Sequence, residues 1–182
     1  VTLYTPDWHF DPAELAAAFG PKTKALVFSL LNNPTGKVFG REELTQIAEQ
    51  CLKWDAYAVC DDIYEHILYD GARHVSPASL PGMEGLGITI NSVSKTYSAT
   101  GWRVGWVITP PEVTGAVRKV HDFLTVGAPA PLQEAATMAL TLGPDYYAGL
   151  AAAYQHARDL LLASLDQSGL KPYQPAGAYY IM

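Results

Sequence analysis

The sequence predicts an α/β protein with a mostly parallel sheet, and three observations support this fold class. Short apolar runs of strand length alternate along the chain with amphipathic segments of helix length, as in β-α-β units. Polar clusters follow several of the apolar runs, where open parallel sheets carry their ligand sites. The 182 residues are 49% hydrophobic and 16% charged, which is typical of a globular domain and gives room for one domain and part of a second.

The first third of the chain is expected to form two helices and two strands. Asp11 and Pro12 suit the N-cap and the first position of a short helix that runs to Phe19. Residues 25–31 and 56–62 are apolar runs of strand length. Between them, apolar side chains recur at spacings of three and four, which predicts a helix over 41–54 with one buried face made of Leu44, Ile47, Ala48 and Cys51.

The rest of the chain is expected to begin with a loop, because residues 71–87 are rich in Gly, Pro and Ser. The elements predicted after it are strands at 87–92 and 105–109, helices at 111–126, 131–142 and 146–169, and a final strand at 177–182. Gly143 and Pro144 break the chain, and the final strand has no partner after it. We therefore assign residues 1–143 to part of a large domain and 144–182 to the beginning of a small α+β domain.

Composition excludes several classes of function. Lys and Arg number 12 against 18 Asp and Glu, and the net charge of −6 is the wrong sign for a general binder of the nucleic acid backbone. No window reaches the roughly 18 consecutive apolar residues that a membrane helix needs. We therefore expect neither nucleic acid nor a membrane as a partner.

Other residues that often carry chemistry are interpreted as structural. Cys51 and Cys60 form no CxxC pair, so they are expected to be buried thiols of a cytoplasmic protein in a reducing compartment. The aromatic segments around Tyr146 and Tyr179 are interpreted as core. The five histidines share no metal-ligand spacing, and no metal site is expected among His9, His66, His74, His121 and His156.

Two polar clusters follow the first two predicted strands. Residues 32–36 have the composition of a tight turn, but the restricted geometry before Pro34, cis or trans, also suits Asn33 to aim its amide at a ligand oxygen. Asp61 closes the second strand, either as the N-cap of the next segment or as a carboxylate that meets a cation, because burying an unpaired charge is costly. Tyr64 lies three residues further on and can point to the same place.

Two more clusters flank the last pair of strands before the helices. The 87–92 strand ends at Ser92, and Ser94 and Lys95 follow it. A lysine in such a loop is commonly solvated, but a partly desolvated one has a lowered pKa and can form a Schiff base with a carbonyl cofactor. Arg103 stands between two glycines and suits bidentate binding of a phosphate, with a structural ion pair as the alternative.

Together these groups describe a pocket for pyridoxal 5′-phosphate: an acid for the ring nitrogen, an amide and a phenol for a ring oxygen, an imine-forming lysine, and hydroxyls with an arginine for the phosphate. Three segments in order resemble the motifs of the class I and II aminotransferases, which are fold-type I pyridoxal-phosphate enzymes. These segments are NNPTGKVF at 32–39, DDIYEHILYDG at 61–71 and SVSKTYSATGWRVGW at 92–106. The resemblance runs through essentially all 182 residues and implies a three-layer α/β/α large domain and a homodimer with the active site at the subunit interface.

The resemblance also implies a role for each candidate residue. Lys95 would hold the cofactor as an internal aldimine and then take and return the substrate Cα proton. Asp61 would pair with the pyridinium nitrogen. The implied catalytic residues are thus Lys95, Asp61 and Tyr64, and the cofactor-binding residues that join them are Asn33 beside Tyr64 at the ring oxygen, and Ser92, Arg103 and, more weakly, Ser94 at the phosphate.

The implied activity is transfer of an amino group between an amino acid and a 2-oxo acid. Two alternatives stay open: a C–S β-lyase of the same fold, and the aminotransferase-like domain of a transcription regulator that senses the cofactor. The negative charge and the lack of a helix-turn-helix pattern argue against the regulator. Because family members are much longer, we interpret the chain as a fragment, with the glycine-containing phosphate loop, the aromatic residue stacked on the ring and the arginine for the substrate carboxylate outside it, and we expect activity to depend on those missing parts.

Overall fold

Four strands form one sheet in the computed structural model, which describes all of residues 1–182. The strand order along the sheet is β1-β2-β3-β4, with β1 parallel to β2, β2 parallel to β3, and β4 antiparallel to β3. Their bounds are β1 Ala25–Ser29, β2 Tyr57–Asp61, β3 Gly87–Ser92 and β4 Gly105–Ile108. The predicted α/β class with a mostly parallel sheet is therefore confirmed.

Five α-helices accompany the sheet, each where the sequence predicts one. They are α1 Pro12–Ala18, α2 Arg41–Trp54, α3 Pro111–Thr125, α4 Ala130–Ala139 and α5 Pro144–Gln167, with short 3-10 turns at Pro77–Ser79 and Thr100–Trp102. Asp11 caps α1 as expected, because its Oδ1 accepts from the Ala13 N–H at 2.8 Å. None of the five helices combines the length and the apolar composition that crossing a membrane requires.

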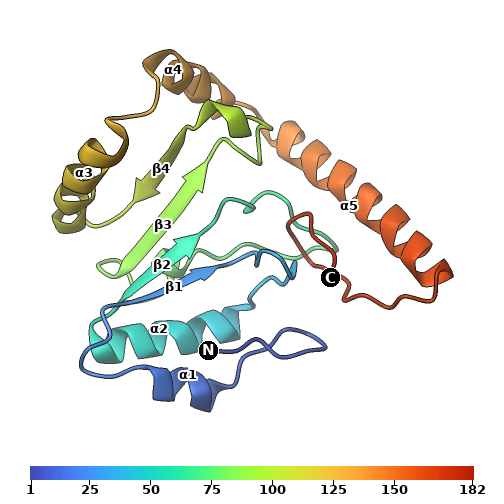
Figure 1. The fold of residues 1–182 in the computed structure, drawn as a ribbon, viewed down its shortest axis with the longest axis horizontal. Coiled ribbons are helices and arrows are strands. Elements are labelled where there is room, and N and C mark those ends of the chain that lie inside the picture. Colours follow the sequence, from blue (N-terminus) through green and yellow to red (C-terminus); the bar gives the residue numbers. More distant parts are fainter.

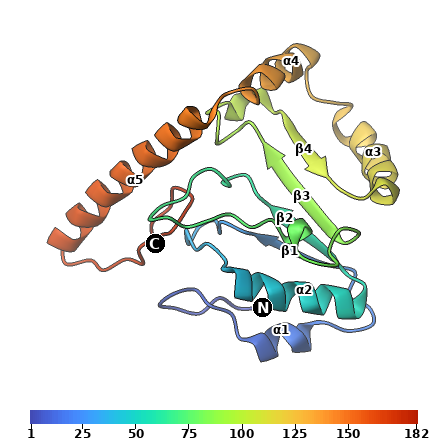
Figure 2. The ribbon, with the colours of Figure 1, turned by 180° about the vertical axis from the view of Figure 1, so that it is seen from behind.

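One face of the sheet is covered by α2, and the main core lies between them (Figures 1 and 2). The apolar stripe of α2 is buried as predicted, at Leu44, Ile47, Ala48 and Cys51. Ala58 and Cys60 of β2 face it and are also buried. Both thiols are free, as the sequence predicts, and burial raises the pKa of Cys51 to about 11.

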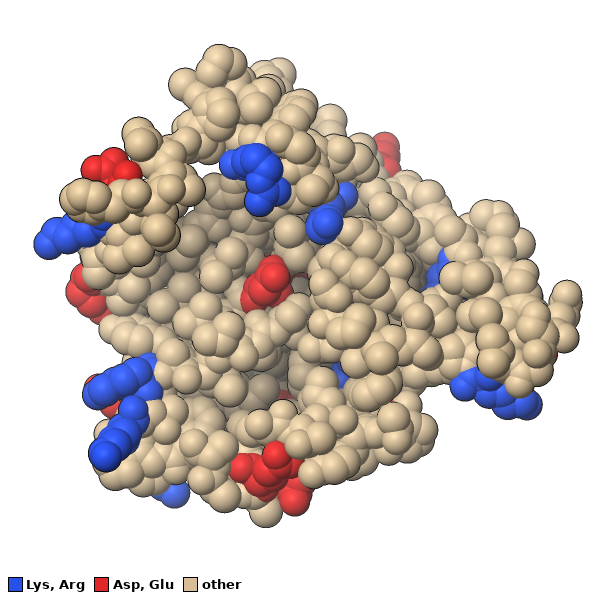
Figure 3. Space-filling model, in the orientation of Figure 1, with Lys and Arg blue, Asp and Glu red and all other residues tan.

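The opposite face of the sheet is open. Side chains alternate between the two faces of a strand, so Val27, Val59 and Asp61 lie on the side away from Cys60. The strand register continues this face to Ile90 and Val107. Val27 is 74% exposed, and Ile90 and Val107 are also exposed. Figure 3 shows a largely uncharged, hollowed surface beside the α3–α4 arch.

The C-terminal segment, residues 175–180, is not a strand, and the prediction of a strand at 177–182 is wrong. Its one ladder contact is an isolated bridge between Leu68 and Gly177. The backbone N–H groups of Ala176 and Gly177 instead both donate to Gly36 O, at 3.0 and 3.1 Å, and that of Ala178 donates to Ile67 O. The backbone N–H groups of this segment are already hydrogen-bonded to two loops, so no continuous strand ladder can form.

Candidate functional site

All four polar clusters meet at one edge of the sheet. The carboxyl ends of β1, β2 and β3 lie at this edge because the three strands are parallel. β4 is antiparallel and pairs Gly105 with Ser92, so its beginning lies there too, directly after Arg103. The topology therefore brings together segments that are about 70 residues apart in the sequence, from Asn33 to Arg103.

Asn33 lies in an exposed turn after β1, and its peptide bond to Pro34 is cis. The side chains of neighbouring residues, rather than that of Asn33 itself, stabilise the turn. Thr35 Oγ1 donates to Asn32 Oδ1 at 2.8 Å, and the buried Lys37 forms an ion pair of 2.6 Å with Glu43. The segment is thus a tight turn, as one interpretation held, and it leaves the Asn33 amide free for a ligand.

Asp61 and Asp62 take opposite sides of the sheet. Asp61 is exposed on the open face, where its Oδ1 accepts from the Ile63 N–H at 3.1 Å. Asp62 is fully buried on the covered face, where Cys60 Sγ donates to its Oδ1 at 2.8 Å and His74 Nε2 lies 3.2 Å from its Oδ2 without hydrogen-bond alignment. The expectation of a buried charge at Asp61 is therefore corrected: the buried carboxylate belongs to Asp62.

Tyr64 is buried, and its hydroxyl lies 2.6 Å from that of Tyr180 in the C-terminal segment. Burial is the main cause that raises the pKa of the Tyr64 phenol above its ordinary value. The phenol therefore stays protonated at neutral pH and can donate a hydrogen bond to an anionic oxygen. The next residue, Glu65, accepts from Asn91 Nδ2 at 2.6 Å, which fixes this segment to β3.

Lys95 lies in a loop, residues 92–100, that is closed by hydrogen bonds within the loop; we call it the lysine loop. Ser94 N–H donates to Ser92 Oγ at 3.1 Å, and Thr100 Oγ1 donates to Ser94 O at 2.8 Å. The expected lowering of the Lys95 pKa is not found. The neighbouring Tyr179 phenol raises the pKa of the amine above its ordinary value of 10.5, because it stabilises the charged form more than the slight burial opposes it.

Arg103 is exposed and has a left-handed backbone, with φ of 55°. Its Nη1 donates to Thr100 O at 3.0 Å, which ties it to the lysine loop. It takes part in no ion pair, so the alternative of a structural ion pair is wrong. Most donors of its guanidinium remain available to an anion beside Ser92 and Ser94.

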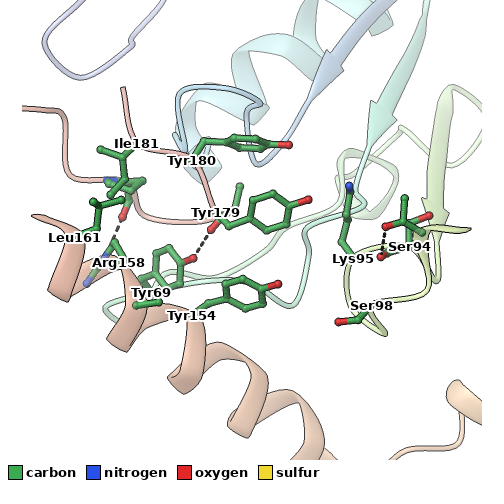
Figure 4. A pocket seen from close by; sticks show the side chains of 14 residues that line it. Tyr69, Ser94, Lys95, Ser98, Tyr154, Arg158, Leu161, Tyr179, Tyr180 and Ile181 are labelled. Atoms are coloured by element: carbon green, nitrogen blue, oxygen red, sulfur yellow. Dashed lines mark hydrogen bonds between the residues drawn. The ribbon is translucent and has the colours of Figure 1, made fainter.

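A cavity of about 520 Å³ opens beside Lys95, between the lysine loop, α5 and the C-terminal segment. Figure 4 shows Lys95 on one side and the hydroxyl ends of Tyr154, Tyr179 and Tyr180 pointing toward it from the other. The interpretation of the Tyr179 region as core is thus wrong, since Tyr179 is 38% exposed and lines this cavity. The short apolar run that begins with Gly-Ala-Tyr-Tyr looks like a strand in the sequence, and only the fold brings it to Lys95.

Arg158 also lines the cavity but is committed to structure. Its guanidinium is buried, and it forms a two-pronged pair with Asp70, with N–O distances of 2.6 and 3.0 Å. Nη1 also donates to Pro175 O at 3.0 Å, and Nε donates to Asp159 Oδ1. The hydrogen bond with Asp70 raises the pKa of Arg158. This arginine anchors α5 to the C-terminal segment and has no donor left for a ligand carboxylate.

These features define an α/β protein with an amine, a carboxylate and a guanidinium at the carboxyl edge of its sheet. Comparison with known proteins identifies its family: residues 1–182 match the family "Aminotransferase class I and II", and the chain belongs to it. It is 44% identical to a kynurenine–oxoglutarate transaminase of Dictyostelium discoideum, over 96% of this chain and 41% of that protein. It is 40% identical to human kynurenine–oxoglutarate transaminase 1, over 97% of this chain and 43% of that protein.

Solved structures agree. N-succinyldiaminopimelate aminotransferase from Mycobacterium tuberculosis superposes with a TM-score of 0.93 at 34% identity, over 96% of this chain and 46% of that one. A double mutant of Thermus thermophilus aspartate aminotransferase gives a TM-score of 0.89 at 37% identity, with the same coverage. The chain thus spans less than half the length of these relatives.

The enzymes of this family use pyridoxal 5′-phosphate, and the donor set at the sheet edge fits that group. Lys95 offers an amine to an aldehyde, Asp61 a carboxylate to a cationic ring nitrogen, and Arg103 a guanidinium to a phosphate. None of these three side chains is engaged in an ion pair within the chain. Their charges are therefore free to meet the opposite charges of the cofactor.

Proposed function

We propose that the protein carrying this chain is a pyridoxal-phosphate-dependent aminotransferase that moves an amino group between an amino acid and a 2-oxo acid. The observation that carries the proposal is the set of unpaired complementary groups, Lys95, Asp61 and Arg103, at one sheet edge. Each of the relatives described above bears the name of a transaminase or aminotransferase, which favours this activity over the lyase and regulator alternatives.

The proposed mechanism assigns one task to each group. When bound, the cofactor supplies an aldehyde carbon and a protonated ring that accepts electrons. Lys95 would hold the aldehyde carbon of the cofactor, and its amine would carry the proton that leaves the substrate Cα. Asp61 keeps the ring nitrogen protonated by offering an exposed carboxylate on the open face.

The remaining residues orient the cofactor. Asn33 and Tyr64 donate hydrogen bonds to the ring oxygen, which the raised pKa of Tyr64 supports because a protonated phenol is a donor. Arg103 and Ser92 bind the phosphate. Ser94 is the weaker candidate there, since it is buried and its backbone N–H is already used by Ser92.

Covalent trapping at Lys95 tests the cofactor assignment. We expect pyridoxal 5′-phosphate followed by borohydride to fix a reduced cofactor on the Lys95 peptide, read by mass spectrometry of a digest. Lys95→Ala should lose this adduct and the absorbance of the cofactor imine near the edge of the visible range. Lys53→Ala is the matched control, because Lys53 is exposed on α2. An equal adduct in Lys95→Ala would refute the assignment.

The reaction itself is tested on the full-length protein, with 2-oxoglutarate as acceptor and a panel of amino donors. Amino transfer predicts glutamate formation that depends on the acceptor. Ammonia and pyruvate from cystathionine without any acceptor would instead identify a C–S β-lyase.

We further propose a homodimer whose interface covers α3, with the active site beside that interface. The apolar side chains of α3 support this, because none is buried within the chain and Phe123 is 93% exposed. Sedimentation velocity of the full-length protein should show a dimer, and Phe123→Asp should shift it toward monomer. A monomer at micromolar concentration without the substitution would contradict the interface.

Two further assignments belong to the same proposal. Residues 1–143 form part of the large cofactor-binding domain and 144–182 begin the small domain, which the direction of α5 away from the sheet supports (Figure 1). The cytoplasm is the proposed compartment, supported by the two free buried thiols.

A further inference from the structure

The C-terminal segment is bound to two of the polar clusters at once. The N–H groups of Ala176 and Gly177 both donate to Gly36 O, in the turn that contains Asn33. The Ala178 N–H donates to Ile67 O, three residues after Tyr64. Tyr69 N–H donates to Ala176 O at 3.0 Å, and the Tyr69 hydroxyl donates to Ala178 O. A Cβ at Gly36 would overlap Pro175, so the close approach requires glycine there.

Two successive tyrosines at the end of this segment reach two different cofactor residues. The Lys95 Nζ lies 5.6 Å from the centre of the Tyr179 ring, on the cavity side. The Tyr180 hydroxyl lies 2.6 Å from that of Tyr64. The Tyr64 ring meets Tyr179 edge-on, with centroids 5.2 Å apart and an interplanar angle of 89°.

Tyr179 is itself held in place from the other side. Tyr154 of α5 stacks on it with a centroid distance of 5.7 Å and an interplanar angle of 20°. Arg158, one helical turn after Tyr154, fixes α5 to Pro175 O and Asp70. The tyrosine therefore cannot swing away from Lys95 without unstacking from a helix that the Arg158–Asp70 ion pair anchors.

We propose that Tyr179 is a positioning residue for Lys95, and that Tyr180 plays the same part for Tyr64. A phenol can accept a hydrogen bond from a charged amine and donate one to a neutral amine, so the Tyr179 hydroxyl, whose ring lies beside the amine, can hold Lys95 in either protonation state. The role of Lys95 and Tyr64 toward the cofactor rests on the proposed function. The positioning itself depends only on side chains that are all within this chain.

The protonation states agree with this arrangement. The nearby Tyr179 phenol raises the pKa of Lys95. Burial raises the pKa of the Tyr179 phenol, but the neighbouring Lys95 amine and Tyr64 hydroxyl outweigh burial and leave the pKa below its ordinary value. The titratable groups that face the Lys95 amine are Tyr179 and Tyr180 of the C-terminal segment and Tyr154 of α5.

The test measures the protonation of Lys95 without the cofactor. Competitive acetylation across pH 7 to 12, read by mass spectrometry of the Lys95 peptide in the full-length protein, reports the reactive neutral amine. Tyr179→Phe keeps the ring and removes the hydroxyl, so the pKa of Lys95 should fall. At pH 9 the amine should acetylate roughly three- to tenfold faster, as expected for the loss of one charge-assisted hydrogen bond.

Tyr154→Phe is the matched control, because Tyr154 stacks on Tyr179 but is not the ring that the Lys95 amine contacts. It should leave the Lys95 profile close to that of the unsubstituted protein, and Tyr180→Phe should do the same. An unchanged profile in Tyr179→Phe, or an equal change in Tyr154→Phe, would overturn the inference. If Tyr179→Phe does not fold, an acetylation profile of the unsubstituted protein with Lys95 as reactive as Lys53 would overturn it equally.

Trapping of pyridoxal 5′-phosphate is run in parallel to separate the two proposals. Failure of trapping on Lys95 in the unsubstituted protein would overturn the proposed function and leave the acetylation result standing. Normal trapping with an unchanged acetylation profile would overturn only the role of Tyr179.

Discussion

The two faces of the sheet differ in what they contact and in what they carry. On the covered face, β2 packs Ala58 and Cys60 against the buried stripe of α2, within a core cluster of 19 buried residues. On the open face, Val27 and Val107 are exposed, and Asp61 stands at the carboxyl end. The second cluster, near β4 and α4, has only 4 buried residues. The covered face therefore holds most of the buried core, whereas the open face carries Asp61, one of the proposed site residues.

This difference explains why Asp61 and Asp62, which are adjacent in the sequence, lie in different environments. A one-residue step along a strand moves a side chain to the other face. Asp62 therefore enters the core and needs Cys60 and His74 around its carboxylate, while Asp61 meets solvent and needs no partner. A free carboxylate at a sheet edge is what a cationic ring nitrogen requires.

The largest expected effect comes from core truncation on the covered face. Leu44 is fully buried, so Leu44→Ala should lower the free energy of unfolding of this chain by about 2–5 kcal/mol, through lost burial and the cavity left behind. Val27→Ala on the open face should change it by no more than about 0.5 kcal/mol, because Val27 is 74% exposed. Urea unfolding followed by circular dichroism measures both.

Protein concentration sharpens this contrast. If Val27→Ala destabilises as much as Leu44→Ala in dilute solution, the open face is not open and the comparison fails. A cost for Val27→Ala that emerges only at high concentration would instead show that association covers this face.

Local patterns predict most of the fold. The 3- and 4-residue spacing in 41–54 predicts both α2 and its buried residues, because a helix at the surface must bury one stripe. The cap at Asp11 and the break at Gly143 hold for the same reason, since their causes lie within a few residues. The strand prediction for 177–182 fails because a short apolar run suits a strand, while the backbone N–H groups of this segment donate to Gly36 and Ile67 instead.

The candidate site is predicted less completely than the fold. The sequence identifies Asn33, Asp61, Lys95 and Arg103 because each follows or precedes a strand, and strand ends meet at one edge. From the sequence, Asp61 is expected to be the buried aspartate and Lys95 to have a lowered pKa. In the structure Asp62 is the buried one, and the pKa of Lys95 is raised. Both errors depend on partners distant in the sequence: His74 and α2 beside Asp62, and Tyr179 beside Lys95. No periodicity or spacing encodes such contacts.

The smallest expected stability effect separates the two aspartates. Asp62→Asn keeps the shape of the side chain but replaces an acceptor with a donor in a site that offers a thiol donor and an imidazole, so it should cost about 1–3 kcal/mol of unfolding free energy. Asp61→Asn should leave stability within about 0.5 kcal/mol, since Asp61 is exposed. The order reverses for the cofactor: Asp61→Asn should weaken the retention of pyridoxal 5′-phosphate on Lys95, and Asp62→Asn should spare it in protein that remains folded. Urea unfolding and borohydride trapping on the same two variants measure both quantities. Equal losses of stability would contradict the division of the aspartates between the faces, whereas equal retention of the cofactor would leave that division intact and remove Asp61 from the site.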